Sequence, residues 1–207
     1  MKRLYVFTLL LLSILNNNAA FSADFQKGVE AFHNEDYAGA IKEWAPLAEK
    51  GDARAQYDMG LLYHTGLGVE LDYQVAIMWY QRAAERQYAP AQFNLGSMYD
   101  NGEGVPQDYK TAIKWYLFAA EQGYSPAQYN LGSMYFGGQG VPKINPVAAY
   151  MWYSIAASEG NEFAQKTLKE IDTTFPDSIK ETATKLKIEC IHQAYVDCWN
   201  TSAIKKY

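Results

Sequence analysis

Apolar side chains recur every three or four residues along most of this chain, which is the spacing of one face of an α-helix. After Asp108 the apolar positions are Ala112, Ile113, Tyr116, Ala119 and Ala120. An Asp before such a run accepts hydrogen bonds from the first N–H groups of a helix. The pattern predicts a helix that starts at Asp108, and Asp72 and Asn145 open similar runs.

Each of these helices follows another helical pattern that ends at a glycine. Ser125-Pro126 opens one of them, with Ser as N-cap and Pro at the first helical position, where its missing N–H costs little. Gly138 ends it, because glycine readily adopts the left-handed conformation found after many helices. Gly66 and Gly102 occupy the equivalent places. We call the helix before the glycine turn helix A and the one after it helix B.

The helix A and helix B pair recurs at a fixed period. Copies begin at Ala55, Ala91 and Ala127, with a fourth start at Ala164, so the spacings are 36, 36 and 37 residues. The first two copies agree at 18 of 36 positions, which makes them true repeats. Such a period predicts an α-solenoid, in which each unit buries its apolar face against its neighbours. The expected fold class is all-α, a right-handed superhelix of antiparallel helix pairs.

A glycine recurs in the middle of helix A, where it costs roughly 1 kcal/mol relative to alanine. Its recurrence at Gly60, Gly96 and Gly132 indicates a packing role. We expect these glycines to let helix A lie close to alanine pairs of helix B, while repeated tryptophans fill the space between units. The pairs are Ala83-Ala84, Ala119-Ala120 and Ala156-Ala157, and the tryptophans are Trp79, Trp115 and Trp152.

The repeats are predicted at residues 55–90, 91–126 and 127–163, with a cap on either side. Residues 23–54 keep helix B but shorten the turn between the helices. Residues 164–207 are more polar and lack the mid-helix glycine. The last helix is expected near Ser178, where Ser178 and Glu181 form a capping box.

Residues 1–22 have the features of a secretory signal peptide. Lys2 and Arg3 precede an apolar core from Leu4 to Leu15, and Ala20-Phe21-Ser22 offers a cleavage site. The core is shorter than the roughly 20 residues that a membrane span needs. We therefore expect export, to a bacterial periplasm or out of the cell.

Composition and motifs exclude several function classes. The net charge is −5, and it becomes −7 without Lys2 and Arg3, so clustered cations for nucleic-acid phosphates are lacking. The histidines lie in different units, and no HExxH, GxSxG or phosphate-loop motif occurs. We expect no catalytic residue, no metal and no cofactor.

The repeated residues resemble a known family. The pattern A-Q-[YF]-x-[LM]-G-x-[LM]-Y-x-x-G-x-G-V, followed by D-Y-x-x-A-x-x-W-Y-x-x-A-A-E, resembles the Sel-1-like repeat (SLR), a relative of the tetratricopeptide repeat. The resemblance covers residues 25 to about 171, with 23–54 as a tetratricopeptide-like opening unit. It implies an all-α superhelix that binds proteins or peptides.

The resemblance also implies a binding face, because helix A lines the concave side of such superhelices. Carried over by position, the aromatic row is Tyr57, Phe93 and Tyr129, and the next rows are Leu61, Ser97 and Ser133, then His64, Asp100 and Phe136. An Asn that can bond a peptide backbone would correspond to Asp58, Asn94 and Asn130. The alternative is that these aromatic and amide groups serve packing and hydrogen bonding between repeats.

Cys190 and Cys198 pose a geometric question. An exported protein favours a disulfide, but eight residues of continuous helix would separate the Cα atoms by about 12 Å, beyond the roughly 7 Å that a disulfide tolerates. Either the helix breaks between them or the bond does not form. Similar SLR proteins end in a Cys-loop-Cys tail, and this resemblance favours the break.

These observations favour an exported adaptor that binds a protein or peptide through its concave face. One alternative is an envelope enzyme or enzyme subunit acting on peptidoglycan or β-lactams, as assigned to some cysteine-rich SLR proteins. The chain lacks their one disulfide per repeat and shows no SxxK motif. Another alternative is a secreted effector that binds a host protein.

Overall fold

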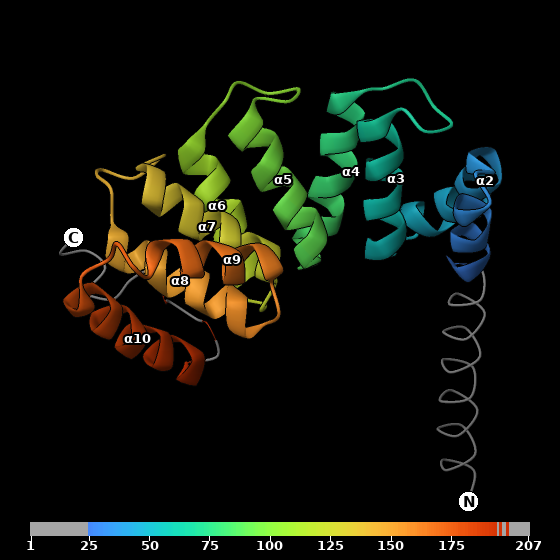
Figure 1. Ribbon diagram of the computed structural model, residues 1–207. Helices are drawn as coiled ribbons and strands as arrows, with labels where there is room; N and C mark the ends of the chain where they lie inside the picture. Colours follow the sequence, from blue (N-terminus) through green and yellow to red (C-terminus); the bar gives the residue numbers. More distant parts are fainter. Residues whose placement is uncertain (1–24, 194, 196–197, 199–207) are drawn as a thin grey trace, which may run out of the picture. The chain divides into compact units, whose positions relative to one another are not determined.

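The computed structural model describes residues 25–193, 195 and 198 (Figure 1). The predicted signal peptide lies outside the described residues. The described residues form helices and turns without any strand, which confirms the all-α fold class. They divide into two compact units, an N-terminal unit that ends at Arg86 and a C-terminal unit that begins at Gln87.

The described part of the N-terminal unit, from residue 25 onward, contains four helical segments. Residues 25–33 are helical and are followed by α2 (Tyr37–Glu49), α3 (Ala53–Thr65) and α4 (Tyr73–Glu85). Helix α3 packs against α2 and α4. The apolar core is built from one face of each helix and includes Trp44, Leu47, Met59, Leu62 and Trp79.

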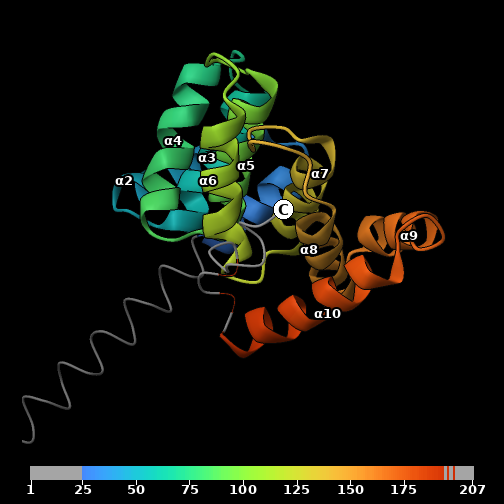
Figure 2. The same cartoon turned by 90° about the vertical axis from the view of Figure 1, so that its left-hand side faces the viewer.

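The C-terminal unit holds the remaining helices. They are α5 (Ala89–Asn101), α6 (Tyr109–Ala120), α7 (Ser125–Gly137), α8 (Pro146–Ser158), α9 (Glu162–Ile171) and α10 (Asp177–His192). The pairs α5–α6 and α7–α8 are the expected A and B helices, and α6 also packs on α7. Helix α10 lies along α8, as Figures 1 and 2 show. The C-terminal cap therefore covers the exposed side of the last full repeat.

The helix ends of the repeats follow the predicted chemistry. The side chains of Asp72, Asp108 and Asn145 accept backbone N–H groups at the starts of α4, α6 and α8. Helices α3, α5 and α7 end at Gly66, Gly102 and Gly138, whose φ angles are 73°, 75° and 70°. These local sequence signals therefore fix where helix A ends and where helix B begins.

Two predicted N-caps are wrong. The N-cap of α7 is Tyr124, whose carbonyl accepts the N–H groups of Ala127 and Gln128, so Ser125 already lies inside the helix. The N-cap of α10 is Pro176, whose carbonyl accepts the N–H of Ile179. In both cases the first helical hydrogen bond is accepted before the serine, which leaves no N-cap position for its side chain.

The mid-helix glycines face tyrosine rings and not the predicted alanine pairs. A Cβ atom at Gly96 would lie 2.6 Å from Cδ1 of Tyr116, and the same holds for Gly60 with Tyr80 and for Gly132 with Tyr153. The rings of Tyr80, Tyr116 and Tyr153 are almost fully buried. Glycine is required because the helix B tyrosine lies flat against the backbone of helix A.

Glutamines near the start of helix A link it to the helix B before it. The Nε2 atom of Gln56 donates to the carbonyl of Ala48 at 3.0 Å, and Gln128 donates to Ala120 at 3.2 Å. Gln165 donates to Ala157 at 3.3 Å in the same way. The repeated Ala-Gln dipeptide thus adds a second hydrogen bond to a carbonyl at the end of the preceding helix, which already accepts the N–H of the glycine three residues later.

The C-terminal cap is closed by the Cys190–Cys198 disulfide, with a Cα–Cα distance of 4.9 Å. This is possible because α10 ends at His192, which confirms the predicted break. Beside the disulfide, Nζ of Lys187 donates to the carbonyl of Ser154 on α8 at 2.8 Å. The disulfide holds Cys198 against α10, which itself packs on α8.

Replacing both cysteines by serine should lower the free energy of unfolding by about 2 kcal/mol, because a loop of eight residues is no longer closed in the unfolded chain. Thermal unfolding followed by circular dichroism measures the change. A reducing agent should lower the melting temperature of the natural protein and leave that of the double variant unchanged. Equal sensitivity of both proteins would contradict this role.

Candidate functional site: the helix A faces

The predicted binding positions lie on the helix A segments α3, α5 and α7. In the N-terminal unit they are Tyr57, Asp58, Leu61 and His64; in the C-terminal unit they are Phe93, Asn94, Ser97, Asp100, Tyr129, Asn130, Ser133 and Phe136. All are half-buried apart from Phe136, which is exposed. Leu62, Leu95 and Leu131 of the same helices are fully buried. Each unit therefore presents a partly accessible strip of helix A side chains.

The aromatic row packs within its own repeats. Ring centroids are 5.7 Å apart for Tyr57 and Tyr80 and 5.6 Å apart for Phe93 and Tyr116. Tyr129 lies 5.5 Å from Tyr153. These tilted pairs account for part of each ring by packing within a repeat, whereas the alternative to ligand binding expected packing between repeats. The remaining surface of each ring is accessible.

The hydroxyl groups of the same helix B tyrosines reach back to the predicted binding positions. Tyr116 donates to Oδ2 of Asp100 at 3.3 Å, and Tyr153 donates to Oγ of Ser133 at 3.2 Å. In the N-terminal unit, the hydroxyl of Tyr80 lies 3.3 Å from Nδ1 of His64. Sequence reasoning missed this role, although the unchanging Trp-Tyr dipeptide opposite variable polar residues was available as a signal.

A polar cluster forms around Tyr116 in the C-terminal unit. The Tyr116 hydroxyl also hydrogen-bonds with the side chains of Asn130 and Ser97, so it joins α5, α6 and α7. Burial raises the pKa of Tyr116, and the nearby Asp100 carboxylate raises it further. Burial raises the pKa of Asp100 as well, although the hydrogen bond from Tyr116 opposes this shift. The hydrogen bonds of the cluster hold the side chains of Asp100, Asn130 and Ser97 in place on the accessible strip. The raised pKa of Tyr116 keeps its hydroxyl protonated, so it is not an activated nucleophile.

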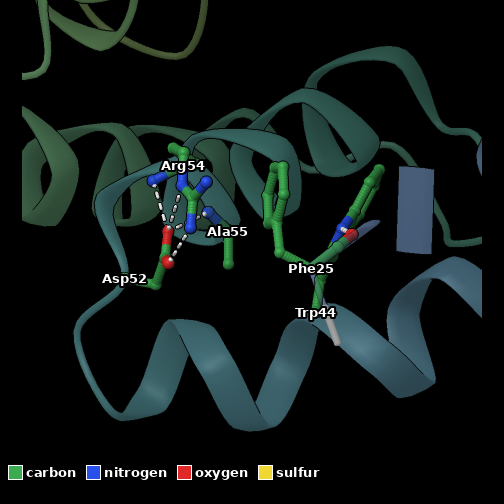
Figure 3. Close-up of polar contacts among 5 residues, drawn as sticks. All are labelled: Phe25, Trp44, Asp52, Arg54 and Ala55. Atoms are coloured by element: carbon green, nitrogen blue, oxygen red, sulfur yellow. Dashed lines mark hydrogen bonds and ion pairs between the residues drawn. The ribbon is translucent and has the colours of Figure 1, made fainter. Parts of the chain in front are cut away.

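Asp58 of the N-terminal unit is the counterpart of Asn94 and Asn130, but its surroundings differ. Trp44 stands in α2 where other repeats have the tyrosine, and its indole N–H donates to the carbonyl of Phe25 at 3.2 Å (Figure 3). Burial and the charge of Asp52 raise the pKa of Asp58 to about 7, and Arg54 opposes the rise.

Arg54 is held in place by two neighbours, both visible in Figure 3. Its Nη2 atom lies 2.8 Å from Oδ2 of Asp52, and its guanidinium carbon lies 4.3 Å from the centre of the Phe25 ring. Asp52 also caps α3 by accepting the N–H groups of Arg54 and Ala55. The cation is therefore directed mainly at Asp52, which leaves the buried Asp58 without full compensation.

The C-terminal segment contacts one end of the strip. The ring of Phe136 stacks on Phe175 with centroids 6.1 Å apart, and Phe175 lies 6.0 Å from Tyr150. The Tyr150 hydroxyl donates to Asp172 at 2.9 Å. Part of the Phe136 surface is thus covered by the turn between α9 and α10.

Within residues 25–193, 195 and 198, no group of three or more His, Cys, Asp or Glu side chains is arranged to hold a metal ion. In the same part of the chain, none of the helices combines the length and the apolar character that crossing a membrane demands.

Comparison with known proteins identifies the repeat. A family model described as Sel1 repeat matches residues 53–88, 89–124 and 125–161. The chain belongs to the Sel1-repeat family. The matched segments begin at the first residues of α3, α5 and α7, two residues before the repeats that we delimited from the sequence. A comparison with curated proteins found no match.

Two solved Sel1-repeat structures are similar to this chain. One is a protective antigen present in uropathogenic Escherichia coli strains, which displays an SLR fold; it is 36% identical with a TM-score of 0.69, over 77% of this chain and 36% of that one. The other is a Sel1 repeat protein from Oxalobacter formigenes, 34% identical with a TM-score of 0.66, over 71% of this chain and 60% of that one. This Sel1-repeat chain thus spans about a third of the length of the first protein and three fifths of the length of the second. It has the scaffold fold of the SLR proteins, a fold that generally serves protein interaction.

Proposed function

We propose that this Sel1-repeat protein is an exported adaptor that binds a peptide or protein partner through its helix A faces. The observation that carries this proposal is the accessible strip that each unit presents, on α3 in the N-terminal unit and on α5 and α7 in the C-terminal unit. There, aromatic, amide and hydroxyl side chains stay partly exposed while Leu62, Leu95 and Leu131 of the same helices are buried. A rigid strip of this kind offers apolar contact and hydrogen bonds without ordering a loop on binding.

Asn94 is the side chain on this strip best suited to a peptide backbone. An amide donates and accepts at once, so it can pair with a backbone N–H and C=O together. Asn94 lies on α5, one residue after Phe93, and both are half-buried. Asn130 is partly committed to the Tyr116 hydroxyl. We therefore assign the central contact to Phe93 and Asn94.

Export is supported by two features of the chain. The Cys190–Cys198 disulfide is compatible with an oxidising compartment outside the cytoplasm. The order of charged, apolar and small residues at positions 1–22 is that of a secretory signal peptide. Together they favour a periplasmic or secreted adaptor.

Asn94→Ala should weaken peptide binding tenfold or more, since the bound backbone would lose both hydrogen bonds in a partly desolvated contact. Peptides are first selected from a random display library on the immobilised natural protein, and their affinities are then measured by fluorescence anisotropy. The matched control is Asn101→Ala, an exposed Asn at the end of the same helix. Phe93→Ala should also weaken binding, with circular dichroism to verify that α5 remains helical.

Two results would overturn this function. One is selected peptides that bind the Asn94→Ala, Phe93→Ala and natural proteins equally well. The other is turnover of peptidoglycan fragments or nitrocefin by the purified protein, which would favour an envelope enzyme. Retention in the cytoplasm on cell fractionation would contradict export alone.

A further inference from the structure

A second surface of the C-terminal unit has the features of a binding groove. Between α6 and the loop after α7 lies a concave site of about 530 Å³, whose exposed lining is almost entirely apolar. Its apolar walls are Ile113, Leu117, Phe118, Tyr135, Val141 and Pro142. None of these residues belongs to the strip of helix A side chains.

Phe118 makes this surface unusual. Its side chain is 51% exposed at the edge of the groove, and its ring meets that of Trp115 edge-on at 5.7 Å. A large aromatic side chain beside an apolar hollow is typical of an interaction site, because a partner that covers it removes substantial apolar area from water.

Charged side chains mark the two ends of the groove. Lys110 and Lys114 lie on the first two turns of α6, and Glu121 lies just after its last turn. The eleven helical steps from Lys110 to Glu121 span about 16 Å, which is the length of roughly five residues of extended peptide. The groove is therefore basic at one end, apolar in the middle and acidic at the other end.

Some residues of the groove are also present at the equivalent positions of the N-terminal unit, and others differ there. The residues 72 positions earlier occupy α2 and the loop after α3, and there Ile41, Tyr63, Gly68 and Val69 match Ile113, Tyr135, Gly140 and Val141. Other lining positions change: Ala38, Ala45, Pro46 and Glu70 stand where the groove has Lys110, Leu117, Phe118 and Pro142. The repeat supplies the shared framework, while the substitutions add a cation and larger apolar side chains to this copy.

We propose that this groove binds a short extended segment of a partner protein with a large apolar side chain between an acidic and a basic residue. The acidic residue lies at Lys110 and Lys114, the apolar side chain fills the hollow beside Phe118, and the basic residue lies at Glu121. Apolar contact gives the affinity, and the opposed charges set the direction of the segment. This is a second binding surface, separate from the helix A faces.

The test uses synthetic peptides labelled with fluorescein and the full-length, disulfide-bonded protein. One peptide has the order Asp-Asp-Leu-Phe-Lys-Lys, a second has the reverse order, a third has Asn and Gln in place of the charged residues, and a fourth has Ser in place of Leu and Phe. Anisotropy titrations should show one charge order binding at least fivefold more tightly than the other. The neutral peptide should bind more weakly, and the serine peptide should not bind.

Variants of the protein assign the site. Phe118→Ser should weaken the preferred peptide tenfold or more, and Lys110→Glu with Lys114→Glu should weaken it at least fivefold and reduce its salt dependence. Phe163→Ser is the matched control, since Phe163 is 72% exposed on α9 and lies outside the groove. Asn94→Ala should leave this binding unchanged, which distinguishes failure here from failure of the helix A assignment.

Three outcomes would overturn the proposal: no saturable binding of any of the peptides, equal losses in Phe118→Ser and Phe163→Ser, or no preference between the two charge orders. Sedimentation of the protein without peptide provides a further test. Self-association that Phe118→Ser abolishes would assign the groove to a second copy of the chain and not to a partner's segment.

Discussion

Gly96→Val should lower the free energy of unfolding of the C-terminal unit by about 4 kcal/mol. The first added atom would already lie 2.6 Å from the Tyr116 ring, which is fully buried and cannot move without disturbing the core. Overpacking of a rigid interior costs 1–3 kcal/mol and sometimes more, and valine adds two further carbons. Helix propensity predicts the opposite sign, because valine is a few tenths of a kcal/mol better than glycine in a helix.

Urea unfolding followed by circular dichroism measures this change. Gly137→Val is the matched control, because Gly137 also lies in a helix A and its Cβ would make only an ordinary contact of 3.5 Å with Gln139. When Tyr116→Ala has already removed the ring, Gly96→Val should lower the free energy of unfolding by much less than it does in the natural protein. This comparison can be made even if the Gly96→Val variant alone fails to fold. A stable Gly96→Val protein would show that the glycine does not serve the tyrosine contact.

Helix ends could be predicted from the sequence because the groups that determine them are close in the chain. The cap of α6 needs only Asp108 and the next three residues, and the end of α5 needs only Gly102. The two wrong caps also concern local chemistry. Ser125 and Ser178 are good N-cap residues, but the carbonyls of earlier residues, Tyr124 and Pro176, accept the first helical N–H groups. Residue preference alone does not decide which of two nearby residues is the N-cap.

Packing partners could not be predicted in the same way. A recurrent glycine shows that something lies close to helix A, but it does not show whether the neighbour is a small alanine or a flat ring. Alanine is the expected neighbour because it is small, whereas in the structure the atoms nearest to Gly96 belong to the Tyr116 ring, and Ala119 and Ala120 are buried as well. The choice depends on how far helix B is rotated about its axis, which the repeat pattern leaves open.

In the candidate site too, the positions of the residues on the helix could be predicted from the sequence, but their packing partners could not. The resemblance to the SLR family implied that Phe93, Asn94 and Asp100 share one side of helix A, but their contacts with other helices were not foreseen. Positions that differ between the copies of a repeat are those most suited to partner choice. Asp100 and Ser133, however, also receive tyrosine hydroxyls, so their variation changes internal hydrogen bonds as well as the accessible surface.

Asp58→Asn should stabilise the N-terminal unit by on the order of 3 kcal/mol at pH 8 and have little effect at pH 4. Burial raises the pKa of Asp58 from 3.8 to about 7, so the folded chain holds a proton that the unfolded chain releases. Between these two values the stability of the natural protein falls as the pH rises, because the unfolded state binds fewer protons. Above pH 7 the folded state carries a partly buried carboxylate, and the full difference of about 4 kcal/mol is an upper limit for a side chain that keeps some contact with water.

Urea unfolding at pH 4, 6 and 8 measures this dependence. Asparagine suits the site, because the equivalent residues of the next two repeats are Asn94 and Asn130. Glu70→Gln is the matched control, since it removes an exposed carboxylate from the same unit and should change little at any of these pH values. A gain that is equal at pH 4 and pH 8 would assign the stabilisation to packing or hydrogen bonding of the amide. A gain that grows as the pH rises would show that the charge on Asp58 itself destabilises the fold. That result would also explain why the Arg54–Asp52 pair alone does not compensate it: the guanidinium is already bound to the Asp52 carboxylate at 2.8 Å.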